Sequence, residues 1–223
     1  MPREQYQDSL DELRADVLAM GDQVIGQVER SLDAAERRDE PLAKKVVDAD
    51  AAVNETYLRL EDRCVDLFAL QQPVAGDLRL VTASFKIITD LERIGDLAVN
   101  LADYLRTATR TLSPEVQLDA IGEAARDLLE RSLAAYEAED AAACRAVAAD
   151  DDEVDALCQR ASESVTRDLI AGTDGDGWEA ERLLDDVSRV LLTIRDLERI
   201  ADHAVNIAAR TLYMIENDPE LLY

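Results

Sequence analysis

Two stretches of the sequence nearly repeat one another. Residues 90–100 read D-L-E-R-I-G-D-L-A-V-N, and residues 196–206 read D-L-E-R-I-A-D-H-A-V-N. Upstream, the tetrapeptide E-R-S-L at residues 29–32 returns at residues 130–133. A repeat of about 100 residues is too long for a solenoid unit and is typical of a duplicated domain. We therefore expect two related halves, residues 1–112 and residues 113–223.

The composition predicts that both halves are helical. Hydrophobic residues make up 48% of the 223 residues and aromatic residues only 4%, with 8 Gly and 5 Pro. So few turn residues exclude a turn-rich β-sandwich. Breaks in the helical pattern occur at residues 39–41, 71–76, 113–115, 139–140 and 172–177. They predict an all-α fold of six helices, each of roughly 25–38 residues, arranged as two tandem, pseudo-symmetric three-helix bundles.

The chain is strongly acidic. Its 49 Asp and Glu outnumber 24 Lys and Arg, which gives a net charge of −25, and only Lys44, Lys45 and Lys86 are lysines. Such a charge argues against a nucleic-acid partner, because a phosphate backbone requires a positive surface. At molar salt the Debye length falls to about 3 Å, so surface charges no longer repel one another over a distance. We interpret the composition as adaptation to a salty cytoplasm, with an ordinary acidic protein as the alternative.

The cysteines and the hydropathy pattern indicate a cytoplasmic protein. Cys64, Cys144 and Cys158 form no C-x-x-C pair, and an odd number of thiols in a helical chain fits a reducing compartment. No apolar run approaches the ~20 residues that span a bilayer. We therefore expect contact with a membrane only through a partner protein.

The repeated helices each carry two carboxylates one turn apart. On a helical wheel, Glu92 and Asp96 lie on one face, and the apolar residues of the same stretch lie on the opposite face. Glu198 and Asp202 repeat this arrangement in the second half. A single pair of this kind is usually a solvated face, but two copies in identical surroundings suggest a shared requirement.

Stacked carboxylate and amide oxygens suit hard or borderline cations. We therefore predict two sites for divalent or trivalent metal ions, such as Fe, Mn, Mg or Zn. The amide side chains one turn further on, and the second helix of each half, supply further candidate ligands. The full set is Glu92, Asp96, Asn100, Asp50 and Asn54 in the first half, and Glu198, Asp202, Asn206, Asp151 and Asp155 in the second.

The residues next to the paired carboxylates are expected to have structural roles. His203 is the only histidine and occupies the position of Leu97, so we expect it to flank the site rather than to bind metal. Arg93 is expected to pair with Asp90 three residues earlier, and Arg199 with Asp196 in the same way.

The repeated run resembles the last helix of each bundle in the PhoU family of phosphate-signalling proteins. The resemblance covers roughly residues 10–217, and the P-V-A-G-D-L-R segment at residues 73–79 adds to it. It implies a cytoplasmic negative regulator of phosphate uptake that contacts a phosphate ABC transporter, through its ATPase subunit, with a sensor kinase or another regulator as a further partner. It also favours a homodimer, metal clusters at the E-x-x-x-D motifs, and no enzymatic activity.

The sequence leaves two other functions as alternatives. A helical scaffold without metal would keep the fold and lose the site. A carboxylate-bridged di-metal oxidase requires inward-facing Glu and two E-x-x-H motifs, which are absent from the sequence.

Overall fold

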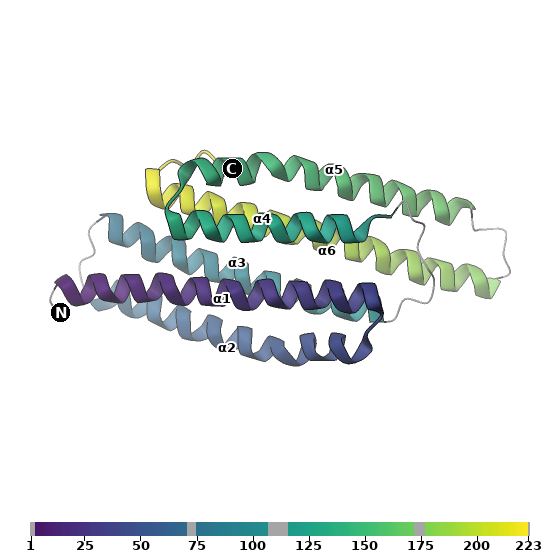
Figure 1. The fold of residues 1–223 in the computed structure, drawn as a ribbon, viewed down its shortest axis with the longest axis horizontal. Helices are drawn as coiled ribbons and strands as arrows, with labels where there is room; N and C mark the ends of the chain where they lie inside the picture. The colour runs from purple at the N-terminus through teal and green to yellow at the C-terminus, as the bar shows by residue number, and fades with distance from the viewer. Residues whose placement is uncertain (1–2, 71–74, 107–115, 172–176, 223) are drawn as a thin grey trace.

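The computed structural model describes residues 3–70, 75–106, 116–171 and 177–222. These residues form six α-helices and no strand, which confirms the all-α prediction (Figure 1). The helices are α1 (Arg3–Arg37), α2 (Glu40–Leu70), α3 (Ala75–Arg106), α4 (Leu118–Ala138), α5 (Ala141–Ala171) and α6 (Gly177–Glu216).

The turn between the first two helices of each half has the same design in both copies. Arg38 and Glu139 each adopt a left-handed backbone conformation with φ of 51°, which ends the helix. An aspartate follows each of them and caps the next helix, since Oδ1 of Asp39 accepts the N–H of Leu42 (3.0 Å). Oδ1 of Asp140 accepts the N–H groups of Ala142 (2.9 Å) and Ala143 (3.0 Å).

The lengths of the helices differ more than the sequence predicted. α4 has 21 residues and α6 has 40, both outside the expected range. α4 begins at Leu118, after the non-helical Val116 and Gln117, so the helix starts later than the S-P-E signal at residues 113–115. That signal, the junction expected at residues 112 and 113, and most of the two loops expected at residues 71–76 and 172–177 lie outside the described residues.

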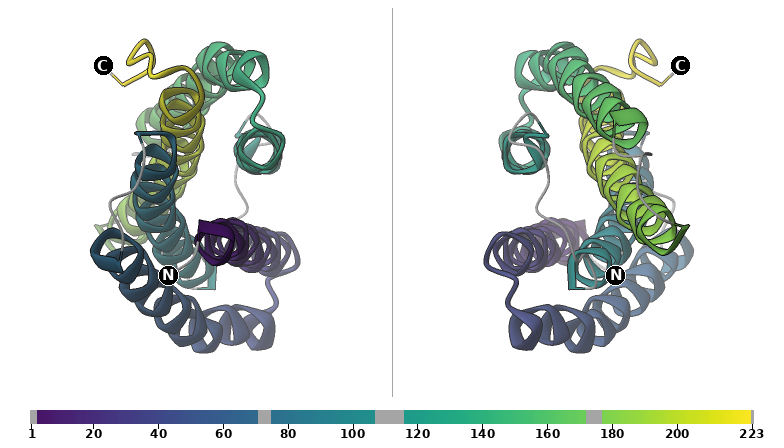
Figure 2. Two further views of the ribbon diagram at one scale, coloured as in Figure 1. Left: turned by 90° about the vertical axis from the view of Figure 1, so that its left-hand side faces the viewer. Right: turned by 90° about the vertical axis from the view of Figure 1, so that its right-hand side faces the viewer.

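Each half is a three-helix bundle, and the two bundles lie along each other. In Figure 1, α1, α2 and α3 form the lower half of the molecule, and α4, α5 and α6 the upper half. The end views place α2 and α5 at opposite outer sides (Figure 2). Within the described residues, the two halves meet through contacts of α3 with α6 and of α1 with α4.

The contact between α1 and α4 is reciprocal. A Cβ added at Gly21 would lie 2.6 Å from Leu133, and one added at Gly122 would lie 2.6 Å from Leu32. Gly21 and Gly122 are 101 residues apart in the repeat, and so are Leu32 and Leu133. Each half thus supplies a glycine that receives the leucine of the other half, as a pseudo-two-fold axis requires.

One hydrophobic core extends through both halves. Leu13 and Ile87 of the first half are fully buried in it together with Leu129 of the second. Tyr136 of α4 is also fully buried, and its hydroxyl lies 2.7 Å from the Ser84 hydroxyl of α3. The apolar faces of the two bundles therefore form one core, and the position of α3 depends on that of α6.

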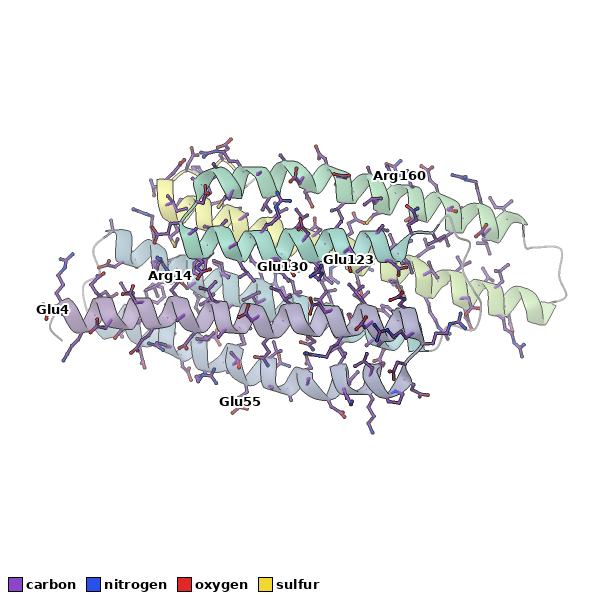
Figure 3. All side chains as sticks on the ribbon, in the orientation of Figure 1. Glu4, Arg14, Glu55, Glu123, Glu130 and Arg160 are labelled. Carbon is purple, nitrogen blue, oxygen red and sulfur yellow. The ribbon has the colours of Figure 1, made fainter. Side chains whose placement is uncertain are left out.

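Ion pairs add to this interface at the surface. Arg14 of α1 pairs with Glu139 at the end of α4, and Figure 3 shows it extending from α1 toward α4. Arg126 of α4 binds Glu29 of α1 (3.1 Å) and also Glu130 of its own helix (2.6 Å). Exposed pairs of this kind contribute little individually, roughly 0–1 kcal/mol each.

All three cysteines are buried and free, as expected from their spacing. Burial raises the pKa of the Cys64 thiol to about 12 and that of Cys144 to about 11. None of the helices in the described part of the chain is long and apolar enough to cross a membrane.

Candidate metal centres

The first candidate site lies between α2 and α3, and we call Asp50, Asn54, Glu92 and Asp96 the α2–α3 cluster. Both oxygens of Asp50 accept hydrogen bonds from amides. Nδ2 of Asn54 donates to Oδ2 (2.9 Å), and Nε2 of Gln27 on α1 donates to Oδ1 (3.3 Å). Two neutral amides thus stabilise the central carboxylate of this cluster.

Gln27 was not among the residues predicted from the sequence. It is 1% exposed, and it lies close to α3, because a Cβ added at Gly95 would be 3.4 Å from its Oε1. The available signal was its position on α1, between the buried Val24 and Val28, where an apolar residue would be expected.

The second candidate site lies between α5 and α6, and we call Asp151, Asp155, Glu198 and Asp202 the α5–α6 cluster. Its members occupy the positions that correspond to the α2–α3 cluster. The two amide donors are missing, because Leu128 stands in place of Gln27 and Asp155 in place of Asn54. Within the described residues, Oδ1 of Asp151 is buried and has no hydrogen-bond partner.

Burial and mutual repulsion raise pKa values in both clusters. The pKa of Asp151 rises to about 6, first because of burial and then because of Asp155 and Asp202. The same two causes, burial and the charge of Asp155, raise the pKa values of Glu198 and Asp202.

In the α2–α3 cluster, burial is again the first cause. It raises the pKa of Glu92 together with the charge of Asp96, and that of Asp96 together with the charge of Asp50. The structure therefore brings the predicted carboxylates of each half close enough to repel one another.

The carboxylates are close without converging on one point. Among the described residues, no group of three or more His, Cys, Asp or Glu side chains is arranged so that it could hold a metal ion. The residue types nevertheless fit a hard cation. A buried, unpartnered carboxylate oxygen beside three further carboxylates is the environment that a cation stabilises.

The two asparagines of the repeated runs, Asn100 and Asn206, stand one helical turn beyond Asp96 and Asp202. Asn100 of α3 lies close enough to Asp196 of α6 for its amide to lower the pKa of that carboxylate, against the larger effect of burial. Asn206 is exposed on α6, and within the described residues no hydrogen bond joins it to the α5–α6 cluster.

His203 lies in the contact between the two halves. It is buried, and its Nδ1 forms a hydrogen bond with Oδ1 of the buried Asp90 on α3 (2.9 Å). Asp90 thus binds His203 instead of Arg93, because packing of α3 against α6 brings the imidazole within reach. The pairing expected in the second half is confirmed, with Arg199 Nη1 lying 3.5 Å from Asp196 Oδ1.

Comparison with known proteins agrees with this architecture. A family model for the PhoU domain matches residues 17–105 and again residues 118–211. The chain belongs to the PhoU family.

Curated relatives match over nearly the whole chain. It is 33% identical over 95% of its length to a phosphate-specific transport system accessory protein PhoU homolog of Pseudomonas putida, covering 81% of that protein. It is 30% identical over 96% of its length to a homolog of the same description from Methanothermobacter thermautotrophicus, covering 95% of it.

Two solved structures share the fold. The crystal structure of PhoU from Pseudomonas aeruginosa aligns with a TM-score of 0.83 and 30% identity, over 96% of this chain and all of that one. The phosphate transport system regulatory protein PhoU from Streptococcus pneumoniae aligns with a TM-score of 0.85 and 25% identity, over 96% and 98% of the two chains.

Membership settles the general class of function. The protein is a PhoU-family accessory protein of phosphate transport regulation. The family is regulatory and non-enzymatic, which removes the di-metal oxidase from consideration and confirms the expectation that the protein is no enzyme.

Proposed function

We propose that the protein is a cytoplasmic negative regulator of phosphate uptake, acting by contact with the ATPase subunit of a phosphate ABC transporter. A sensor kinase or another regulator is a further partner in this proposal. Similarity to phosphate-specific transport accessory proteins over 95% of the chain supports the phosphate system as the setting. A net charge of −25 argues against nucleic acid as the target.

An exposed apolar stripe on α2 supports action through protein contact. Leu58 is 57% exposed, Val65 is 52% exposed, and Phe68 follows on the same side of the helix. In the described part of the chain, α2 contacts only α1 and α3, so this face is turned away from the molecule. The corresponding positions on α5 are Gln159, Thr166 and Leu169, so the second half keeps an apolar residue at one of the three.

The proposal includes metal ions at the duplicated carboxylates. The observation that carries it is the buried, unpartnered Oδ1 of Asp151 among three other carboxylates. Asp151, Asp155, Glu198 and Asp202 would hold the ion in the second half, and Asp50, Glu92 and Asp96 in the first. A bound cation supplies positive charge that neutralises the clusters, and the side chains would have to turn toward one another to receive it.

Two features of the chain's setting belong to the same proposal. The family resemblance favours a homodimer, and equilibrium sedimentation measures the oligomeric state directly.

The excess of acidic residues over lysine favours a salty cytoplasm. We expect the folded state to become more stable as the concentration of potassium chloride rises, because screening weakens the repulsion between surface carboxylates.

A pull-down of tagged protein from its own cytosol and membranes, with and without excess phosphate, tests the adaptor role. We expect recovery of the transporter ATPase subunit, and less recovery with Leu58→Asn/Val65→Asn. Absence of the subunit under both phosphate conditions would contradict the proposed contact.

The same assay separates a metal-dependent adaptor from a metal-free scaffold. Glu198→Gln/Asp202→Asn should reduce recovery, whereas Glu4→Gln/Asp8→Asn should not. The control pair has the same residue types and spacing, is exposed, and lies on α1, away from the apolar stripe of α2. Equal recovery by both variants would favour the scaffold.

A further inference from the structure

A cleft beside the C-terminal end of α6 is lined by positive charge. It has a volume of about 540 Å³ and lies where α3, α6 and the segment after α6 meet. Lys86 of α3 and Arg210 of α6 line it together with the polar Thr82, Tyr213 and Asn217. No acidic side chain is among the described residues that form its walls.

The two cations of this cleft have no acidic partner. Within the described residues, neither Lys86 nor Arg210 takes part in an ion pair, and Nε of Arg210 is buried without a hydrogen-bond partner. The nearest arginine on α3, Arg79, donates its Nε to the carbonyl oxygen of Met214 (3.2 Å). The chain has 49 acidic and 24 basic residues, so two basic side chains without an acidic partner at one cleft are unusual. Their positive charge would be neutralised by a bound anion.

Neighbouring carboxylates are already engaged elsewhere. Glu216 binds Arg145 (2.6 Å), and Oδ1 of Asp218 accepts the N–H of Glu220 (3.0 Å). Within the described residues, neither of them forms an ion pair with Lys86 or Arg210.

The cleft is not repeated by the pseudo-symmetry. Leu192 stands at the position that corresponds to Lys86, and Tyr104 at the position that corresponds to Arg210. Arg189, which corresponds to Ala83, pairs with Asp186 (4.0 Å). The unpaired cations therefore do not follow from the duplication that explains most of the sequence.

We propose that this cleft binds a small anion that carries a phosphate group. Arg and Lys are the side chains that bind phosphate oxygens by charge-assisted hydrogen bonds. The remaining walls are apolar, formed by Ala83, Pro219 and Leu222. A cleft of this volume is in the range of small-molecule sites and exceeds what inorganic phosphate alone would fill. A phosphomonoester would place its phosphate at the cations and its organic part against the apolar wall.

The inference rests on the cleft and not on the proposed contact with a transporter. It is tested by isothermal titration calorimetry of the full chain at a fixed potassium chloride concentration. The probes are inorganic phosphate, phenyl phosphate and phenol. We expect saturable binding of at least one phosphate probe and none of phenol. Tighter binding of phenyl phosphate would identify a phosphomonoester as the ligand, and tighter binding of inorganic phosphate the free ion.

Variants locate the binding. Lys86→Gln and Arg210→Gln should each weaken binding about tenfold, the loss expected for one charge-assisted hydrogen bond. Lys44→Gln, which removes an exposed lysine of α2, should leave the affinity unchanged. Lys86 is itself exposed, so its variant retains the fold even if Arg210→Gln is destabilised. Failure of both phosphate probes to bind saturably, or wild-type affinity in Lys86→Gln, would overturn the proposal.

Discussion

The α2–α3 and α5–α6 clusters occupy equivalent places in a duplicated fold. They differ in how the chain stabilises the charge of the central aspartate. In the first, the amides of Gln27 and Asn54 donate to both oxygens of Asp50. In the second, those amides are replaced by Leu128 and Asp155, and Oδ1 of Asp151 is left buried without a partner within the described residues. The comparison teaches that the first cluster is partly stabilised by the chain itself, whereas the second depends more on a cation.

The largest effect is expected where the two halves meet. His203→Leu places in α6 the residue that α3 has at Leu97, and it leaves the buried carboxylate of Asp90 without its partner. We expect the free energy of unfolding to fall by about 2 kcal/mol. Chemical denaturation measures this change.

A second variant separates the lost hydrogen bond from lost packing. Adding Asp90→Leu to His203→Leu removes both polar partners and should restore most of the stability, because no buried group is then left unpaired. Equal instability of the single and double variants would assign the effect to packing alone.

Metal binding should distinguish the clusters directly. Glu198→Gln/Asp202→Asn should weaken the tightest manganese site about tenfold or more, and Glu92→Gln/Asp96→Asn should affect only a weaker site. Calorimetric titration of metal-free protein with manganese gives both affinities. Equal losses of manganese affinity in the two variants would show that the amides of the α2–α3 cluster do not affect its affinity for a cation.

Single substitutions of the central aspartates should change stability in opposite directions. In metal-free protein at pH 7, Asp151→Asn should raise the free energy of unfolding by about 1 kcal/mol, allowing for solvent screening. Asp50→Asn should lower it by a similar ~1 kcal/mol, since one amide loses its acceptor. Thermal unfolding of the two variants tests the difference in sign.

The carboxylate of Asp151 should also make the stability of the protein depend on pH. Its pKa is about 6 in the folded protein against an ordinary value of 3.8, so the folded state binds the proton more tightly than the unfolded state. The contribution of Asp151 to stability is therefore lost as pH rises through this interval, from 3.8 to about 6. Asp151→Asn should lack this part of the decline, and an identical pH profile in wild type and variant would contradict the assignment.

The smallest effect is expected from making the first cluster resemble the second. Asn54→Asp removes one amide donor from Asp50 and adds a repelling charge, at a cost of roughly 0.5–1 kcal/mol without metal. Manganese should restore the loss and bind this cluster more tightly than in wild type. A variant that is destabilised with and without manganese would argue against a shared metal-binding design.

Much of this architecture could be predicted from the sequence, because the repeat at residues 90–100 and 196–206 carries it. The carboxylate pairs follow from helical geometry, as does the pairing of Arg199 with Asp196. These predictions need only local spacing along one helix.

Predictions failed where packing between helices decides the outcome. Asp90 and His203 are 113 residues apart, and only the contact of α3 with α6 joins them. Gln27 reaches Asp50 from a third helix. Asn100 lies close to Asp196 of the other half. The late start of α4 at Leu118 was missed because proline in S-P-E resembles a helix N-terminus wherever it occurs.

The central claim is that the two clusters differ in their need for a cation, and hydrogen exchange during a manganese titration tests it most directly. The account predicts that the first equivalent of manganese protects the amides of α5 and of α6 around Glu198 and Asp202. Protection of α3 around Glu92 and Asp96 should follow only at higher concentration. Simultaneous protection of both regions, the reverse order, or no change in either would contradict it.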